Sequence, residues 1–367
     1  MNTPSFGRRT TRRLAGAVCA LALVTAACGS DDDGADEASD TTAATESTDA
    51  PDESAPAGTD APDDTSDMDD GEPFRIAVIS PSATNDLAFS QSMYDALQVL
   101  SEQRELELAF SDGLFVVEDG AAAIRDYAEQ GYDLVIAHGT QYGGSLEEIA
   151  PDYPEVSFAW GTASDTFGMD NVFAYTSAAD EGGYVMGTMA AALTTDAIGV
   201  VGPIEAGDAK LYVDGFVAGA QAGGNSDVAV NYIGSFSDVA LASEAAQSFV
   251  ASGVGAMTGT AQMVVGAVGV AAAASIPWFG TQANQTQLAP DFVVASQVYH
   301  WEVVLADIID LVESGTLGGE MFGIDFANGG LTIEFNDGYE LDPSIKELGE
   351  TTAAGLADGS TTTGVEG

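Results

Sequence analysis

From residue 74 onward, short apolar runs of β type alternate with stretches of helical periodicity, and this alternation limits the possible folds more than any other feature of the sequence. The expected strands span residues 75–80, 106–110, 134–138, 156–160, 172–175, 198–201, 228–233, 255–258, 277–280 and 293–297. The expected helices span residues 89–103, 121–129, 146–150, 181–193, 212–223, 239–252, 263–274 and 301–314.

Strands that are apolar on both faces and separated by helices are typical of parallel sheets covered by helices on each side. The two sets of about five strands therefore predict an α/β protein with two doubly wound lobes. In such folds ligands bind outside the carboxyl ends of the strands.

The charge of the chain is extreme, with 9 Lys and Arg against 58 Asp and Glu and a formal net charge of −49 at pH 7. Residues 31–72 hold 17 of the acids and no base, which leaves 41 acids and five bases in residues 73–367. Such a surface repels DNA, RNA and anionic lipid, so no nucleic-acid partner is expected, and it disfavours strong binding of a phosphorylated ligand. Adaptation to a salty or acidic habitat explains this charge better than an acidic functional patch.

The segment RRTTRRLAGAVCALALVTAAC, residues 8–28, has the layout of a secretion signal: arginines, a short apolar run and small residues. The apolar run is shorter than the ~20 residues that cross a bilayer. Cys28 follows two alanines as in a bacterial lipobox, although Thr25 stands where Leu is usual. We therefore predict a lipoprotein signal over residues 1–27 and lipidation of Cys28. An ordinary cleaved signal is the alternative, and the export route, Sec or twin-arginine, stays open.

Two segments have compositions that cannot support a packed core. Residues 28–72 consist almost entirely of Asp, Glu, Ser, Thr, Ala, Pro and Gly, which predicts a disordered acidic tether behind the lipidated cysteine. Residues 346–367 are rich in Gly, Thr and Ala and are predicted to be a flexible tail. The two cysteines, at positions 19 and 28, lie in or beside the signal, so no disulfide is expected in the folded body.

The sequence offers little for catalysis. The two histidines, His138 and His300, lie far apart, and no HExxH, GxSxG or P-loop pattern occurs. The run VVGAVG at residues 264–269 lacks the GxGxxG order and indicates tight packing between a helix and a strand. We therefore expect no catalytic residue, no metal site and no cofactor, and the protein is not expected to be an enzyme.

Small, hydroxyl and amide residues recur where successive strands end, and this recurrence predicts a binding cleft. After the first strand, residues 80–97 form a polar turn that opens a helix. In that turn Asp86 is either a ligand contact or the N-cap, and Phe89 faces either the cleft or the core. His138 is either a strand-end residue bonded to backbone or a cleft contact. Aromatic faces beside directional polar groups suit a flat or ring-shaped uncharged ligand. The later strand ends read HGTQYGG, WGTASD, GP, GSFSD, TGTAQ and GTQANQ.

A family resemblance is carried by Asn85-Asp86-x-x-Phe89-Ser90 and by the segments AEQGYDLVIAHG (128–139), FAWGTASD (158–165), DEGGYVMGTMAA (180–191), IGVVGPIEAGDAKLYVDGFVAGA (198–220), YIGSFSDVALA (232–242), WFGTQANQ (278–285) and VVASQVYHWEVVL (293–305). In this order they resemble the basic membrane protein (BMP) family of substrate-binding lipoproteins. Its best understood members are purine nucleoside receptors of ABC importers. The resemblance implies a type I periplasmic-binding-protein fold, in which two Rossmann-like lobes joined by three hinge crossings close around ligand.

The resemblance also implies roles for single residues. Asp86 and Phe89 match the family's first-loop motif, in which the aromatic ring stacks on the base. Phe236 stands at the usual position of a second aromatic residue, which gives a stack on both faces of the ligand. Ser90 stands where an Asn is usual.

Two departures concern the sugar side of the ligand. Most nucleoside-binding members carry an Asp for the sugar hydroxyls in the motif written here GTQANQ, where this chain has Thr281 and Gln282. Tyr299 stands near the place of a common Lys. Neutral amides form weaker hydrogen bonds than charged groups, so both losses weaken a nucleoside as the ligand without excluding it. The expected ligand contacts are Asn85, Asp86, Phe89, Ser90, His138, Gln141, Trp160, Phe236, Asp238, Gln262, Gln282 and Asn284.

The sequence therefore predicts an extracytoplasmic solute-binding lipoprotein that captures a small neutral solute, a nucleoside, purine or sugar-like compound, and delivers it to the permease of an ABC importer. We expect a monomer, lipid-anchored to the outer face of the cytoplasmic membrane. Two alternatives stay open: a ligand-sensing surface lipoprotein without a permease, and a nucleoside hydrolase. The expected ranges are 74–178 and 298–317 for lobe 1, and 179–297 and 318–345 for lobe 2.

Overall fold

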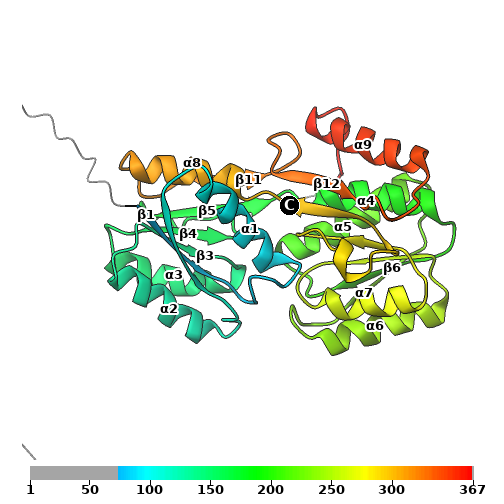
Figure 1. The fold of residues 1–367 in the computed structure, drawn as a ribbon, viewed down its shortest axis with the longest axis horizontal. Helices are drawn as coiled ribbons and strands as arrows, with labels where there is room; N and C mark the ends of the chain where they lie inside the picture. The colour runs from blue at the N-terminus through cyan, green and yellow to red at the C-terminus, as the bar shows by residue number, and fades with distance from the viewer. Residues whose placement is uncertain (1–72, 366–367) are drawn as a thin grey trace, which may run out of the picture. The chain divides into compact units, whose positions relative to one another are not determined.

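The computed structural model describes residues 73–365. The predicted signal peptide, the predicted lipidation of Cys28 and the predicted tether lie outside these residues. Within them the chain forms two β-sheets with helices on both faces of each (Figure 1).

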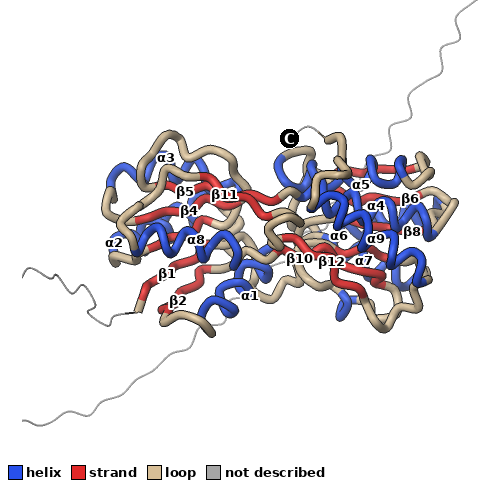
Figure 2. Tube along the Cα trace, turned by 90° about the horizontal axis from the view of Figure 1, so that it is seen from above, coloured by secondary structure: helices blue, strands red, loops and turns tan. Residues whose placement is uncertain are grey.

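The first sheet has the strand order β11-β5-β4-β3-β1-β2 and is parallel throughout. Four helices flank it, and we call this assembly the first lobe (Figure 2). Its strands are β1 (Phe74–Ile79), β2 (Leu106–Ser111), β3 (Leu134–Ala137), β4 (Ser157–Gly161), β5 (Val172–Ser177) and β11 (Met321–Ile324). Its helices are α1 (Phe89–Ser101), α2 (Val117–Glu129), α3 (Gly143–Ile149) and α8 (Glu302–Glu313), with the 3-10 turns η1 (Thr140–Tyr142) and η2 (Ala150–Asp152).

The second sheet has the order β12-β10-β9-β8-β6-β7, in which only β12 runs antiparallel to its neighbour. With its helices it forms the second lobe. Its strands are β6 (Ile198–Gly202), β7 (Val228–Tyr232), β8 (Ala256–Gly259), β9 (Trp278–Gly280), β10 (Val293–Tyr299) and β12 (Leu331–Phe335). Its helices are α4 (Ala179–Leu193), α5 (Gly207–Ala222), α6 (Val239–Ser252), α7 (Val264–Ala273) and α9 (Pro343–Ala357), with the 3-10 turn η3 (Thr286–Leu288).

The inner strands β3, β6 and β9 contain only apolar residues and glycine because both faces of each sheet are covered. In β1, Ile76 and Val78 pack with the buried side chains of α1 and α8, whereas Ala77 and Ile79 pack with those of α2 and α3. The second sheet is covered in the same way, by α4, α5 and α9 on one face and by α6 and α7 on the other. Burial on alternating sides of the pleat therefore explains the uninterrupted hydrophobic runs.

Helices α4 and α5 approach each other closely enough to need glycine at the contact. A Cβ atom placed on Gly187 would lie 2.1 Å from the carbonyl oxygen of Phe216, and one on Gly219 would lie 2.0 Å from that of Tyr184. Neither position could carry a side chain without moving the helix axes apart. This packing fixes the N-terminus of α5, which borders the candidate site described below.

The chain passes between the two sheets at three places. It does so between β5 and α4, between β10 and α8, and between β11 and β12. The second passage contains His300, whose Nδ1 lies 2.9 Å from Oε1 of Glu302 and whose Nε2 lies 2.9 Å from Oγ1 of Thr332. The hydrogen bond with Glu302 raises the pKa of His300.

The α/β class with two doubly wound lobes is confirmed, and the expected strands and helices all occur, although α2 begins at Val117 and α5 at Gly207, well before the expected residues 121 and 212. The sequence interpretation missed β11, β12 and α9. Residues 318–345 were expected in the second lobe, but β11 pairs with β5 in the first sheet. Its sequence, MFGI, is apolar but only four residues long, which is too short to show a period.

Helix α9 corrects the prediction of a flexible tail over residues 346–367. Asp342 caps it by accepting from the backbone nitrogen of Ser344 at 2.9 Å, and Pro343 occupies its first turn. Ile345 and Leu356 are buried in the core shared with α4. The Gly, Thr and Ala composition that suggested a tail instead allows close packing, since Gly349 lies against the side chain of Met189.

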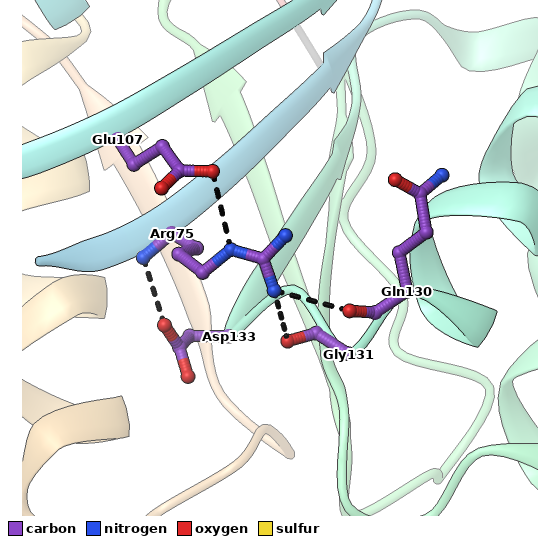
Figure 3. Close-up of polar contacts among 5 residues, drawn as sticks. All are labelled: Arg75, Glu107, Gln130, Gly131 and Asp133. Carbon is purple, nitrogen blue, oxygen red and sulfur yellow. Dashed lines mark hydrogen bonds and ion pairs between the residues drawn. The ribbon is translucent and has the colours of Figure 1, made fainter. Parts of the chain in front are cut away.

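Arg75 shows how the few bases of the folded part are used (Figure 3). Its Nε donates to Glu107 at 3.3 Å, its guanidinium donates to the carbonyls of Gln130 and Gly131 at 3.0 Å, and its backbone nitrogen donates to Asp133 at 2.8 Å. The guanidinium carbon also lies 4.1 Å from the ring centre of Tyr132. Arg75 thus joins β1 and β2 to the α2–β3 connection, where the positive charge supports the edge of the first sheet.

Candidate binding site

A cavity of about 350 Å³ lies where the carboxyl ends of the strands of both sheets meet. Every lining residue follows a strand or begins a helix, which is the place that doubly wound sheets use for ligands. The lining residues are Pro81, Phe89, Phe115, Val117, Gly139, Thr140, Gln141 and Thr162 from the first lobe, and Ile204, Ala206, Gly207, Asp208, Ala209, Phe236, Ala261, Gln262 and Gln282 from the second.

Phe89 begins α1 and forms part of the first-lobe wall. Its ring stacks on that of His138, with ring centres 3.8 Å apart and planes 8° from parallel. The Phe89 side chain is 7% exposed, so most of the ring is held by the protein and one part of it borders the cavity. The Phe89 ring therefore lies partly in the core and partly at the cleft, so each of the two expected positions is correct in part.

His138, at the end of β3, is fully buried behind Phe89. Its Nε2 lies 3.1 Å from the carbonyl oxygen of Phe89, and its Nδ1 lies 2.8 Å from the hydroxyl of Tyr175. Since a carbonyl oxygen only accepts, Nε2 carries the proton and Nδ1 accepts from Tyr175. Burial lowers the pKa of His138 to about 3, which keeps the ring neutral. His138 holds Phe89 in place and does not line the cavity. Its contacts are therefore those of a structural residue bonded to backbone and not those of a ligand contact.

Asp86 caps the start of α1. Its carboxylate accepts from the backbone nitrogens of Ala88 at 2.8 Å and of Ser90 and Gln91 at 3.1 Å, as well as from the hydroxyl of Ser82. The hydroxyl of Ser90 is in turn 2.6 Å from that of Ser82. Asp86 and Ser90 therefore shape the first loop and do not line the cavity.

The second-lobe wall carries polar groups whose hydrogen-bonding capacity is unused. Gln262 and Gln282 both line the cavity, and the Oε1 atom of each is buried without a hydrogen-bond partner. Gln141 faces the cavity from the first lobe. A buried amide oxygen without a partner costs about 1–3 kcal/mol, which a ligand that donates a hydrogen bond would recover.

Backbone strain is concentrated at the same place. Three non-glycine residues that line the cavity have left-handed backbones: Thr162 with φ 56°, Ala261 with φ 74° and Gln282 with φ 70°. Each follows a strand end, at β4, β8 and β9 respectively. Residues held in this region cost of order 1 kcal/mol or more and cluster at functional sites.

Four other predicted contacts lie away from the cavity lining. Asn85 is exposed, and Asn284 donates to Glu334 at 2.6 Å. Trp160 stacks on Phe167 and donates to the carbonyl of Gly139. Asp238 caps α6 by accepting from the backbone nitrogen of Leu241 at 2.9 Å. The predicted contacts that do line the cavity are Phe89, Gln141, Phe236, Gln262 and Gln282.

Sequence reasoning missed Asp208, the only ionisable residue of the cavity lining. It lies in the first turn of α5, and its Oδ1 and Oδ2 accept from the hydroxyls of Thr176 and Ser177, each at 2.9 Å. Desolvation raises the pKa of Asp208 to about 6, although the two hydroxyls favour the ionised form. The segment GPIEAGDAK contains the residue, but among so many acids one carboxylate gave no signal.

A direct contact between the lobes was also missed. Nε2 of Gln285, which follows β9, donates to the carbonyl oxygen of Leu87 in the β1–α1 loop at 3.2 Å. The Gln285 side chain is fully buried and also accepts from Nε1 of Trp278 at 2.9 Å. The two lobes are therefore joined by a direct hydrogen bond between residues outside the cavity lining.

Two kinds of feature are absent from residues 73–365. In this part of the chain no helix has the length and apolarity to cross a bilayer. The same residues contain no group of three His, Cys, Asp or Glu side chains placed to hold a metal ion.

Among curated proteins, the chain is similar to a purine-binding protein of Brucella abortus, with 25% identity over 73% of this chain and 75% of that protein. It is similar to an ABC transporter nucleoside-binding protein of Lactococcus lactis, with 26% identity over 77% of this chain and 85% of that protein. It also matches a transcriptional activator of Bacillus subtilis at 27% identity, but spans only 48% of that protein and 43% of this chain.

Solved structures agree on the fold. A solute-binding protein of an ABC transporter system from Aeropyrum pernix superposes with a TM-score of 0.70 at 20% identity, covering 79% of this chain and 93% of that one. A corresponding protein from Conexibacter woesei gives a TM-score of 0.65 at 21% identity, covering 78% and 97%. These neighbours confirm the two-lobed fold of periplasmic solute-binding proteins.

The family comparison covers nearly all of the described fold. The model of the Bmp family, described as ABC transporter substrate-binding protein PnrA-like, matches residues 74–353. That range contains both sheets and every lining residue of the cavity. The chain therefore belongs to the Bmp family of PnrA-like ABC transporter substrate-binding proteins.

Proposed function

We propose that the cavity binds a purine nucleoside or a closely related neutral solute, which the protein delivers to an ABC permease. The observation that carries this proposal is one cavity that has a phenylalanine from each lobe, Phe89 and Phe236, and no positively charged residue in its lining. The names of two relatives, a purine-binding and a nucleoside-binding protein, support the same ligand class.

The first lobe is suited to stacking. The ring of Phe89 is oriented by its parallel contact with His138, and the hydrogen bond from His138 fixes the backbone beneath it. A flat base on the free part of the Phe89 ring would extend an existing stack, with little loss of side-chain entropy on binding. Phe236, half-buried in the β7–α6 loop, would cover the ligand from the second lobe.

The charge of the lining favours an uncharged ligand. A phosphorylated ligand would meet no Lys or Arg among the lining residues and would face the carboxylate of Asp208. The unpartnered oxygens of Gln262 and Gln282 would accept from N–H or O–H groups of a base or sugar. Bridging of the two walls by one ligand would favour the closed form, which the permease would recognise.

The cellular setting of the proposal is a lipid anchor at Cys28, after removal of residues 1–27. Residues 28–72 would then tether the body, as a monomer, to the outer face of the cytoplasmic membrane. A tether beside the permease raises the local concentration of loaded receptor. Labelling of the protein by a fatty-acid probe in cells, lost in Cys28→Ala, would support the anchor, and equal labelling of both proteins would refute it.

The ligand is tested with the soluble body, residues 73–367. We expect mass spectrometry to find a purine nucleoside in the protein purified under native conditions, and calorimetry to show binding of adenosine, guanosine or inosine after the ligand is removed. Ribose alone should bind much more weakly, because it lacks the base. Binding of none of the three nucleosides would refute the ligand class.

Two rival functions make different predictions. A sensing role without a permease is favoured by the match to the Bacillus subtilis transcriptional activator and by a TM-score of 0.65 to a transcriptional activator of the comK gene from Bacillus halodurans. Deletion of the gene should lower uptake of the labelled nucleoside if the protein serves a permease and leave uptake unchanged if it is only a sensor. Release of free base from a nucleoside by the purified body would instead establish a hydrolase.

A further inference from the structure

We infer that Asp208 recognises a pair of vicinal hydroxyls on the ligand and so makes the cavity selective for a ribonucleoside over a deoxyribonucleoside. This inference rests on the proposed function and names the residue that reads the sugar. The residue that takes this role lies in the first turn of α5. The motif after β9, in which the resemblance implies a carboxylate for the sugar, has Thr281 and Gln282 instead.

The carboxylate is held in place by the chain that joins the two lobes. Oδ1 accepts from Oγ1 of Thr176 and Oδ2 accepts from Oγ of Ser177, both at 2.9 Å. Thr176 and Ser177 end β5, in the sheet of the first lobe, whereas Asp208 belongs to a helix of the second. The position of the carboxylate is therefore set by both lobes at the hinge side of the cavity.

The hydrogen-bonding capacity of Asp208 is only partly used. An ionised carboxylate has about four acceptor sites, and here one hydroxyl donates to each oxygen while the backbone N–H of Ser177 gives a further interaction with the carboxylate. Acceptor capacity therefore remains on a carboxylate that lines the cavity. Two acceptors on neighbouring oxygens match two hydroxyls on adjacent carbons of a furanose ring, each donating to one oxygen.

The surroundings of Asp208 explain why it needs such a ligand. The lining contains no cation, and desolvation is the main cause of the raised pKa of the carboxyl. The ionisable groups that face Asp208 from β5 and β10 are the hydroxyls of Tyr175 and Tyr299, whose pKa values are raised, so they stay neutral. A buried anion without a counter-charge is stabilised most by additional hydrogen-bond donors, which hydroxyls supply.

Two further acceptors lie in the same lining. The Oε1 atoms of Gln262 and Gln282 are buried without partners and line the cavity together with Asp208. The second-lobe wall thus presents three hydrogen-bond acceptor groups. It suits the part of a ligand that carries several donors, such as the hydroxyl groups of a ribose.

The test compares adenosine with 2′-deoxyadenosine on the full-length chain, using wild type, Asp208→Asn and the matched control Asp214→Asn. Asp214 lies on the same helix, pairs with Lys210 and is not part of the cavity lining, so its variant makes the same change of charge outside the site. We expect wild type and Asp214→Asn to bind adenosine roughly tenfold or more tightly than 2′-deoxyadenosine. In Asp208→Asn the ratio should fall toward one, since an amide cannot accept from both hydroxyls.

The pH dependence gives a second readout. The pKa of Asp208 is raised to about 6 in the free protein, and the donors of the ligand favour the ionised form. The affinity of wild type for adenosine should therefore fall roughly tenfold between pH 7 and pH 5, while that of Asp208→Asn should stay flat. Thr176→Val, which removes one donor to the carboxylate, should move the fall to higher pH.

The outcomes separate this inference from the proposed function. If wild type binds adenosine and Asp208→Asn keeps both the tenfold preference and the pH dependence, Asp208 does not read the sugar, but the nucleoside remains the ligand. If wild type binds no nucleoside, both are overturned. Unfolding curves of Asp208→Asn should match those of wild type or shift to higher stability at pH 7, because a half-buried, desolvated charge is removed.

Discussion

The two walls of the cavity differ in how completely their side chains are satisfied. In the first lobe, Phe89 is stacked on His138, whose two ring nitrogens both have partners, and Asp86 caps α1 with several bonds. In the second lobe, Gln262 and Gln282 have unpartnered oxygens, and Gln282 also has a strained backbone.

This difference indicates a division of labour. A wall whose groups are already bonded is rigid before ligand arrives and suits an apolar, stacking contact. A wall with unused acceptors is less stable by itself and gains from a ligand that donates hydrogen bonds. Substitutions in the first wall should therefore lower both folding stability and ligand affinity. Substitutions in the second wall should lower ligand affinity without a matching loss of folding stability.

Phe89→Ala should have the largest effect. The ring is almost fully buried and packs on His138, so we expect the free energy of unfolding to fall by about 3 kcal/mol and nucleoside binding to be lost. Denaturant unfolding and calorimetry measure the two. A variant with unchanged stability would show that the first wall is not preassembled around this ring.

The two histidines should show opposite pH effects on stability. The folded-state pKa of His138 is about 3, below the ordinary 6.5. Below pH 6.5 the unfolded chain therefore binds a proton at this residue that the folded protein does not bind, and this favours unfolding. Its contribution is complete above pH 6.5 and declines toward pH 3, by about 2 kcal/mol between pH 7 and pH 5.

His138→Gln, which retains a donor and an acceptor, should remove this decline in unfolding curves taken at pH 7 and pH 5. His300→Gln is the control: the pKa of His300 is raised, so its contribution is present at low pH and is lost as the pH rises. Loss of the His300 contribution should therefore make stability fall more steeply from pH 7 to pH 5. Equal slopes in His138→Gln and wild type would contradict a neutral, buried His138.

Phe236→Ala should affect binding alone. The ring is half-buried in a loop, so stability should change by less than about 1 kcal/mol, whereas ligand binding should weaken by more than about 1 kcal/mol through the lost stack. Phe322→Ala is a matched control, because that half-buried ring packs on Phe173 away from the cavity. Unchanged affinity in calorimetry would remove Phe236 from the site.

The sequence was sufficient for the features that rest on long-range periodicity. Alternating apolar strands and helices predicted both lobes, and the strand ends predicted the location of the cavity. It could not rank residues within those strand ends. Asp238 and Asn284 are polar residues after strand ends, as Gln262 and Gln282 are, but Asp238 caps a helix N-terminus and Asn284 is bonded to Glu334.

Asp208 shows the other limit of the sequence. Its importance comes from a half-buried position between two lobes and from hydroxyls some thirty positions earlier in the chain, at Thr176 and Ser177. Neither property leaves a local pattern in a chain with 58 acids. Helix α9 was missed for a similar reason, because its stability comes from packing on α4 more than from its own Gly- and Thr-rich composition.

Gln282→Gly should change stability in the opposite direction to the substitutions above. Its backbone φ of 70° suits glycine, and the unpartnered oxygen disappears, so the free energy of unfolding should rise by about 1 kcal/mol. Nucleoside binding should nevertheless weaken roughly tenfold, because an acceptor is lost from the second wall.

Ser275→Gly separates strain from function. Ser275 has a comparable φ of 56°, is exposed and does not line the cavity. Its replacement should raise stability by a similar amount and leave affinity unchanged. If Gln282→Gly gains stability and keeps full affinity, the second wall does not use this amide, and the strain at Gln282 has no link to the ligand. If both substitutions lower stability, the left-handed backbones are not strained, and the second wall is as well satisfied as the first.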